Sequence, residues 1–267
     1  MKQLKLMVLT LTLLMGTMFT SCMDSGESGP QQWAGVVKVN DRMGYVTFTD
    51  AAGTEVVPTN TIPVTLNARM AYIYCQVDEG QDLSTNPKSI KITLLADPTG
   101  IDATAITTPK VGESGDVTTN APVGSLSFAS GYSTVAPFQF SENTIVLPVL
   151  YRVKNVTTTE DIKNELAKHT FTLVCYTDDI KSGDTILKLY LRYKVEDEPA
   201  AIAERATRTS SFKAYEISQI LREYTLKSGQ AKPAKITIVA QQNEYNNKLE
   251  DTSTTEKVYE IEYKTAE

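Results

Sequence analysis

The chain has 267 residues, with 26 lysines and arginines against 32 aspartates and glutamates, and its formal net charge is −6. This acidic balance argues against nucleic acid as a partner, because nucleic-acid binding depends on lysine and arginine at the phosphates. The length is enough for one large domain or two ordinary ones. Many threonines, 13 tyrosines and few helix-period patterns favour an all-β fold.

Residues 1–21 are predicted to be a signal peptide. Lys2 and Lys5 precede an uncharged, mostly apolar run at residues 6–19, and small residues follow it. A transmembrane helix is the competing interpretation, but a span needs about 20 predominantly apolar residues, and threonine, serine and glycine dilute this run. Removal of the segment leaves a net charge of about −8. The mature protein is therefore expected outside the cytoplasm.

Residues 19–22, Phe-Thr-Ser-Cys, resemble the lipobox of bacterial lipoproteins, in which a cysteine is acylated after cleavage just before it. The resemblance implies that Cys22 is the mature N-terminus and carries diacylglycerol and fatty acids such as palmitate. Two or three acyl chains hold a protein durably on a bilayer. The polar residues 22–32 are predicted to be a flexible tether. We expect an outer-membrane lipoprotein, with a periplasmic and a surface-facing orientation both open.

Residues 33–97 are predicted to form a small β-barrel. Short alternating segments follow one another with turn residues between them, and five or six such strands in about 65 residues suit an OB-like barrel. The strand signals lie at residues 33–40, 44–50, 55–58, 62–66, 69–77 and 88–96.

Residues 98–124 are rich in proline, glycine and threonine and are predicted to be a linker. Residues 125–267 are predicted to form an Ig-like β-sandwich with short helical connections. Regular alternation of apolar and polar residues at residues 185–195 indicates an antiparallel sheet with one solvent-exposed face. Helices are predicted at residues 159–168, capped by Thr159, and at residues 218–224. The strands are expected at residues 145–153, 170–177, 185–195, 211–216, 235–241 and 257–263.

Two cysteines remain after Cys22. Cys75 and Cys175 each share a strand face with apolar residues, so both are predicted to be free, buried core thiols. An oxidising envelope compartment would permit a disulfide between them, which is the competing interpretation.

The signal ending in Ser21-Cys22, the first-domain segments Gly35-Val36-Val37 and GYVTFTD at residues 44–50, and the β-rich second domain together resemble the NigD-like lipoproteins of Bacteroides relatives. The resemblance implies an OB-like domain followed by a β-sandwich. The family takes its name from a gene that neighbours a bacteriocin gene, which implies an immunity role. Most members of the family have no known activity, so the resemblance implies a location and an architecture.

No catalytic constellation is present in the sequence. His169 is the single histidine, and no metal-ligand spacing, nucleophile elbow or phosphate-binding loop accompanies it. Carboxylate clusters at residues 178–179 and 196–198 lie at predicted strand ends, where acids are usually just solvated. We therefore predict a non-enzymatic protein with no cofactor and no metal.

Exposed aromatic residues are the main candidates for binding. Tyr72, Tyr74, Tyr190 and Tyr215 are predicted to project from strand faces and could stack on sugars or serve a protein interface. Packing under loops or against the other domain is the alternative. Thr185, in Asp184-Thr185-Ile186, is similar to the O-glycosylation site of exported Bacteroides proteins and is a second candidate for modification besides Cys22.

The leading hypothesis is a lipid-anchored envelope protein that binds a protein or glycan partner. One alternative is a surface glycan-binding lipoprotein of a polysaccharide-uptake system. Another is a fimbrial subunit, which would need proteolysis at an arginine, and Arg42, Arg205 and Arg208 are the candidates for that cleavage.

Overall fold

The computed structural model describes residues 31–60, 66–81, 83, 87–113, 116–130 and 133–265. The predicted signal peptide, Cys22 and nearly all of the predicted tether and of the strand at residues 62–66 lie outside these residues. The chain divides into two compact units. The first, the barrel unit, comprises residues up to Ala103 together with residues 129–134, and the second, the sandwich unit, comprises residues 104–128 and 135–267.

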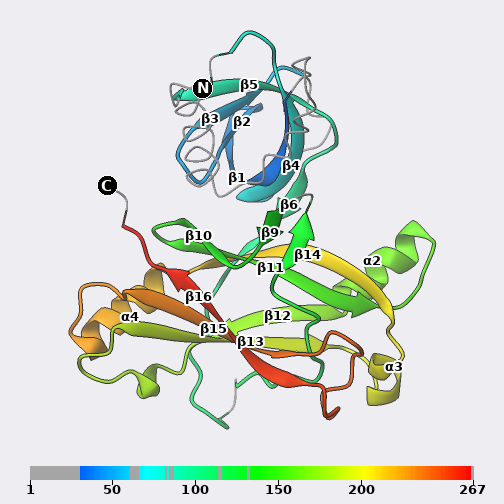
Figure 1. Ribbon diagram of the computed structural model, residues 1–267, viewed down its shortest axis with the longest axis vertical. Helices are drawn as coiled ribbons and strands as arrows, with labels where there is room; N and C mark the ends of the chain where they lie inside the picture. Colours follow the sequence, from blue (N-terminus) through cyan, green and yellow to red (C-terminus); the bar gives the residue numbers. More distant parts are fainter. Residues whose placement is uncertain are drawn as a thin grey trace, which may run out of the picture. The chain divides into compact units, whose positions relative to one another are not determined.

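Five strands of the barrel unit close on themselves (Figure 1). They are hydrogen-bonded in the order β1-β2-β3-β5-β4, and β4 returns to pair with β1. Trp33, Phe48, Ile73 and Ile92 fill the interior. The OB-like barrel predicted from the sequence is confirmed. Its strands are β1 (Gln32–Arg42), β2 (Tyr45–Thr49), β3 (Glu55–Pro58), β4 (Met70–Val77) and β5 (Ser89–Leu94), and β6 (Thr99–Ile101) pairs with the first residues of β4, ahead of the stretch of β4 that pairs with β5.

The sandwich unit has two four-stranded sheets that share one hydrophobic core (Figure 1). Leu147 from the first sheet and Leu189 and Ile238 from the second are fully buried in that core. The first sheet has the order β10 (Phe138–Ser141), β11 (Thr144–Val153), β14 (Thr207–Glu216), β7 (Ala103–Ala105). The second has the order β12 (His169–Val174), β13 (Ile186–Val195), β15 (Lys235–Gln242), β16 (Thr255–Glu262), and β8 (Phe128–Ser130) pairs separately with β9 (Ser133–Val135).

The second sheet is mixed, which the sequence did not predict. β12 and β13 form the expected antiparallel pair, but β13 and β15 run parallel. Parallel neighbours need a long crossover connection. Here the chain leaves β13, passes through β14 of the other sheet and returns by a helix before it enters β15. The alternation of apolar and polar residues along β13 shows that one face of the strand is exposed to solvent. It does not show whether the neighbouring strands run parallel or antiparallel to β13.

The described residues contain three α-helices. In α2 (Thr159–Ala167), the cap is Thr158 and not the predicted Thr159, because the Thr158 hydroxyl accepts the Asp161 N–H at 3.1 Å. The α4 helix (Ser218–Ser228) is one turn longer than predicted, and Gly229, with φ of 76°, ends it in the left-handed region. The α3 helix (Pro199–Ala203) was not predicted, and η2 (Thr177–Asp179) is a single 3₁₀ turn. None of the described helices is long and apolar enough to cross a bilayer.

Both core cysteines are free and buried, as predicted. Burial raises the pKa of the Cys75 thiol and of the Cys175 thiol to about 12, so both stay protonated at neutral pH. A protonated, buried thiol behaves as a small apolar side chain.

A buried ion pair lies at one end of the sandwich unit. The Arg205 side chain is fully buried, and its Nε and Nη2 atoms donate to the two carboxylate oxygens of Glu165 at 2.7 and 3.2 Å. Arg205 Nη2 also lies 3.1 Å from a carboxylate oxygen of Asp197, which Lys154 and Lys168 approach at 3.2 Å. Each buried charge therefore has an opposite charge within hydrogen-bond distance, as buried charges require.

His169 belongs to the same cluster. Its Nδ1 lies 2.7 Å from the Tyr193 hydroxyl, and its Nε2 lies 3.3 Å from Glu165. Burial lowers the pKa of His169 below its ordinary value. Burial alone would raise the pKa of Glu165, but hydrogen bonds from the Lys154 N–H and from Arg205 outweigh it and lower that pKa. The residues of this buried ion network come from α2, from the ends of β11, β12 and β13, and from the connection to β14.

Acidification is expected to destabilise the sandwich unit in two steps. The folded-state pKa of His169 is depressed, so its contribution is complete above the ordinary value of 6.5 and is lost as the pH falls from there towards the folded pKa. The folded-state pKa of Glu165 is also depressed, so its contribution to stability is lost as the pH falls below the ordinary value of 4.5. Urea unfolding between pH 8 and pH 3 measures both steps.

The matched control for this prediction is His169→Gln. Because His169 is the only histidine, the variant should lose the step between pH 7.5 and pH 5.5 and keep the step below pH 4.5. Stability that rises on acidification from pH 7.5 to pH 5.5 in the unsubstituted protein would contradict the buried, neutral histidine.

Candidate functional site

The four tyrosines predicted as a binding surface do not form one row. Tyr215 is the clearest correction: it is 1% exposed, and its hydroxyl donates to the Phe171 carbonyl at 3.1 Å. A tyrosine ring can be buried when its hydroxyl has a partner, so a strand position alone did not distinguish this ring from an exposed one. Tyr215 is a core residue of the sandwich unit.

Tyr190 lies on the outer face of β13, but cations of its own strand flank it. The Lys188 Nζ lies 5.0 Å from the ring centroid and the Arg192 guanidinium lies 5.1 Å from it. The ring of Tyr176 is 5.2 Å away, and the Tyr176 hydroxyl accepts from Arg192 and donates to Asp116 at 2.9 Å. A sugar would compete with these cations for the faces of the Tyr190 ring. Tyr176 lies in the strand expected at residues 170–177 and Asp116 in the predicted linker, and no sequence pattern indicated that the two side chains meet beside Tyr190.

Tyr72 and Tyr74 lie on one face of β4, in the barrel unit. Tyr72 is half-buried, whereas Tyr74 is 39% exposed and its hydroxyl donates to the Gln32 side chain. Thr185 is exposed directly before β13, and its carbonyl accepts the Ala234 N–H at 2.8 Å. Cys22 lies outside the described residues. The predicted modification site at Thr185 is thus accessible, and the aromatic surface reduces to Tyr74 with part of Tyr72.

His169 is not placed for catalysis. Its side chain is 1% exposed, and both ring nitrogens are engaged with Tyr193 and Glu165. A general base must reach the proton of a bound substrate, and this imidazole is closed off from solvent. Within the described ranges, no group of three or more histidine, cysteine or acidic side chains has the geometry of a metal site.

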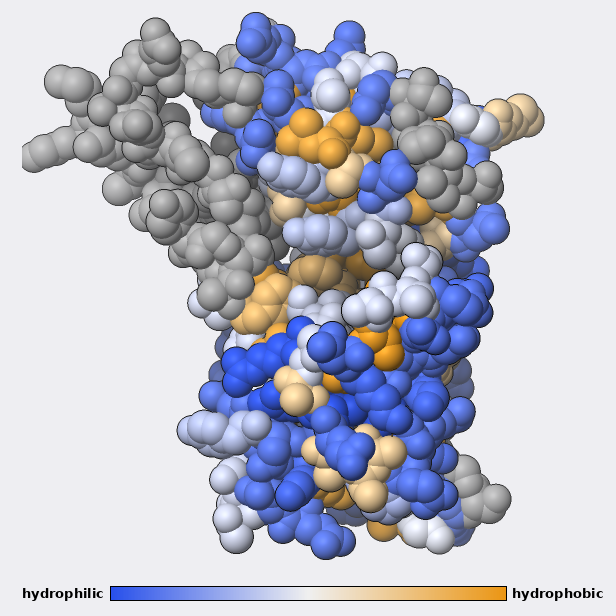
Figure 2. Space-filling view, turned by 90° about the vertical axis from the view of Figure 1, so that its right-hand side faces the viewer, coloured by the Kyte–Doolittle hydropathy of each residue, from blue (hydrophilic) through white to orange (hydrophobic). Residues whose placement is uncertain are grey.

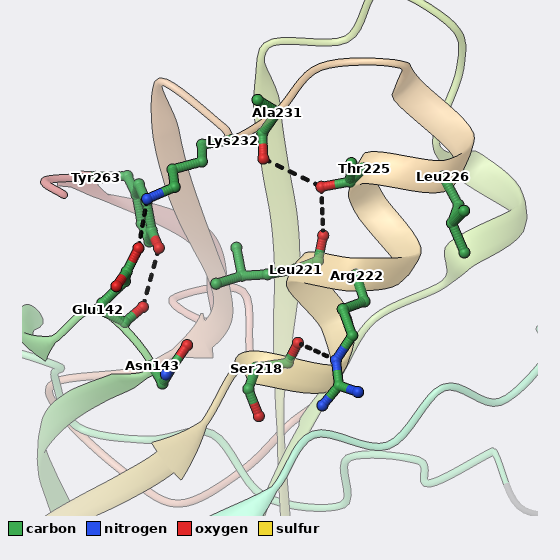
Figure 3. A pocket seen from close by; sticks show the side chains of 10 residues that line it. All are labelled: Glu142, Asn143, Ser218, Leu221, Arg222, Thr225, Leu226, Ala231, Lys232 and Tyr263. Carbon is green, nitrogen blue, oxygen red and sulfur yellow. Dashed lines mark hydrogen bonds and ion pairs between the residues drawn. The ribbon is translucent and has the colours of Figure 1, made fainter.

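A groove with a volume of about 510 Å³ runs beside α4 in the sandwich unit (Figure 3). Leu221 points from α4 toward the Tyr263 and Lys232 side chains, whereas Leu226, which is 79% exposed, projects from another side of the helix. The groove falls in the size range of ligand pockets. Its lining comprises Glu142, Asn143, Ser218, Leu221, Arg222, Thr225, Leu226, Ala231, Lys232 and Tyr263.

The wall opposite α4 is held by contacts between the edge strands of the two sheets. Gln139, on β10, forms two hydrogen bonds of 2.7 Å with the backbone of Lys264, just after β16. The Tyr263 hydroxyl donates to the Glu142 carbonyl at 3.0 Å, and the Lys232 ammonium pairs with the Glu142 carboxylate. These contacts fix the wall before any ligand arrives, so the α4 groove is preformed.

The chemistry of the α4 groove is that of a binding surface. Leu221, Leu226 and the Tyr263 ring offer apolar contact, and the Glu142–Lys232 pair is neutral as a unit. Arg222 is exposed at the rim, where its Nε donates to the Ser218 carbonyl at 3.4 Å. The face of the molecule shown in Figure 2 carries hydrophobic residues only in small groups within a mainly hydrophilic surface.

Two solved structures place the chain among known proteins. A protein of Bacteroides fragilis NCTC 9343, named "Putative lipoprotein", is 94% identical to it, with a TM-score of 0.82, over 89% of this chain and 100% of that one. A protein of unknown function, DUF1344, from Bacteroides vulgatus ATCC 8482 is 10% identical, with a TM-score of 0.53, over 87% of this chain and 91% of that one, and this likeness shows the fold alone.

No protein-family model and no curated protein matches the chain. The NigD-like assignment therefore stays a prediction. The lipoprotein prediction agrees with the name of the 94% identical protein, and a lipoprotein is located in the cell envelope in association with a membrane. The chain belongs to the same family as this Bacteroides fragilis lipoprotein.

Proposed function

We propose that the protein is a lipid-anchored, non-enzymatic binding protein of the outer membrane that takes a protein partner in the α4 groove. The observation that carries the proposal is the 94% identity to a Bacteroides protein named as a lipoprotein. The anchor is Cys22, whose preceding residues Phe-Thr-Ser resemble a lipobox. A bacteriocin-immunity role is the specific form of this function that the NigD-like resemblance implies.

The groove favours a protein partner over a glycan. Its apolar side chains, the half-buried Leu221 and the exposed Leu226, suit the apolar side chains of a peptide, whereas sugar binding relies on open aromatic faces and polar groups. Tyr190, the best placed aromatic of the sandwich unit, already has cations beside its ring. The glycan-binding alternative would depend on Tyr74 of the barrel unit.

The positions of the arginines argue against a fimbrial subunit. Arg205 is 1% exposed and ion-paired, so a protease cannot reach it in the folded chain. Arg208 lies within β14 and is paired with β11. Arg42 ends β1, and cleavage there would remove the strand that closes the barrel.

Replacement of Cys22 with alanine tests the anchor. The unsubstituted protein should incorporate an alkyne-tagged palmitic acid analogue and sediment with membranes, and Cys22→Ala should lose all of the label. Fatty-acid labelling is the deciding measurement, because an uncut signal peptide could itself hold the variant at the membrane. Cys75→Ala is the control and should keep the label, since Cys75 is a buried core residue. Labelling of Cys22→Ala at the normal level would refute acylation at this site.

A photo-crosslinking amino acid at Leu226 tests the groove, with the same amino acid at Leu166 as the control. Both leucines are exposed on helices of the sandwich unit, but Leu166 is on α2, outside the groove. We expect a discrete protein adduct in living cells from position 226 alone. With that partner purified, Leu226→Asp should weaken binding roughly thirty-fold, which corresponds to the loss of about 2 kcal/mol that defines an interface hot spot, and leave stability unchanged.

Two outcomes would contradict protein binding in the groove. Equal adducts from positions 226 and 166 would mean non-specific collision. Retention of the protein on a polysaccharide affinity gel that is abolished by Tyr74→Ala and not by Leu226→Asp would favour the glycan alternative instead.

A further inference from the structure

Two arginines face each other across neighbouring strands of the sandwich unit. Arg152 on β11 and Arg208 on β14 are register partners in the antiparallel pair. Like charges directly opposite each other destabilise a sheet unless something compensates them. Arg152 is only 7% exposed, whereas Arg208 is exposed to solvent. We call these two residues the arginine pair.

Both guanidinium groups converge on one backbone oxygen. Nη2 of Arg152 and Nη2 of Arg208 donate to the Glu244 carbonyl at 2.6 and 2.7 Å. Arg152 also donates to the Ala206 carbonyl at 3.1 Å, and its buried Nε has no partner among the residues that the structure describes. The Glu244 carbonyl carries only a partial negative charge, whereas each of the two guanidinium groups that donate to it carries a full positive charge.

No carboxylate neutralises the arginine pair within the described part of the chain. Glu244, whose backbone carbonyl binds both arginines, accepts a hydrogen bond from Gln242 with its side-chain carboxylate. Burial and the charge of Arg208 lower the pKa of Arg152. The contrast with Arg205 is direct, because that buried arginine is paired with the carboxylates of Glu165 and Asp197.

The loop that carries Glu244 is rigidly built. Asn243 is 1% exposed, and its side-chain oxygen accepts the Tyr245 and Asn246 N–H groups at 2.8 and 3.1 Å. Its side-chain nitrogen donates to Thr254 at 3.0 Å. These bonds fix the Glu244 carbonyl, which in turn fixes the two guanidinium groups. The positive charge is therefore held in place and open to solvent at Arg208.

We propose that the arginine pair binds a tetrahedral oxyanion of the sulfate or phosphate type, either as a free ion or as a group on an acidic glycan. A guanidinium group presents five N–H donors in a fork that matches such oxyanions. The exposed Arg208 contacts the anion directly, and the buried Arg152 contributes its positive charge without contacting the anion. The anion supplies the negative charge that the surrounding chain lacks.

Arg208→Gln is the variant that tests the proposal, because an exposed position tolerates substitution. Lys163→Gln, which removes an exposed cation of α2 outside the α4 groove, is the matched control. Sodium sulfate is titrated against the mature chain, with sodium chloride of equal ionic strength as the reference, and the thermal midpoint and calorimetric binding are recorded. We expect saturable sulfate binding with a rise in midpoint for the unsubstituted protein and for Lys163→Gln, and loss of both for Arg208→Gln.

A second pair of probes, dextran sulfate and neutral dextran, distinguishes the source of the anion. Binding of inorganic sulfate and of dextran sulfate through Arg208 supports a site that takes either form. Binding of sulfate alone supports a free-ion site, and binding of dextran sulfate alone supports an acidic glycan. If the arginines only hold the loop, Arg208→Gln lowers the midpoint equally in both salts and leaves the sulfate increment unchanged, which would overturn the proposal.

Discussion

The ion pair between Glu165 and Arg205 is the constraint on which the arrangement of the sandwich unit depends. Both side chains are buried, so each charge would be strongly destabilising without the other. The pair and its neighbours Asp197 and His169 come from α2, the start of β12, the end of β13 and the residues before β14. A single buried network thus fixes four segments that fall into two parts of the sequence, residues 165–169 and residues 197–205.

One stretch of chain connects the Glu165–Arg205 ion pair to the arginine pair and to the α4 groove. Arg205 is fixed by Glu165, β14 begins two residues later, and Arg208 therefore takes its place opposite Arg152. β14 then leads directly into α4, whose exposed side lines the groove. The buried network, the arginine pair and the α4 groove therefore each draw residues from the stretch 205–228, and a change at Arg205 should affect both surfaces.

Alternation in the sequence predicted the strands well because each strand has one buried face. It correctly placed β13 and the two core cysteines, whose neighbours two residues away are apolar. It could not give the parallel partner of β13, the burial of Tyr215 or the ion pair of Arg205, because these depend on residues distant in sequence. The groove was missed for the same reason: its lining comes from the β10–β11 turn, α4, the loop after α4 and the residue after β16.

A double-mutant cycle on Glu165 and Arg205 tests the central claim most directly. The free energy of urea unfolding is measured at pH 7.5 for Glu165→Gln, Arg205→Met and the double variant. Each single change removes a charged partner from a buried charge and should cost about 3–5 kcal/mol, whereas the double change should cost much less than the two together. Costs that simply add would contradict the claim, because they would mean that the two side chains stabilise the sandwich unit independently.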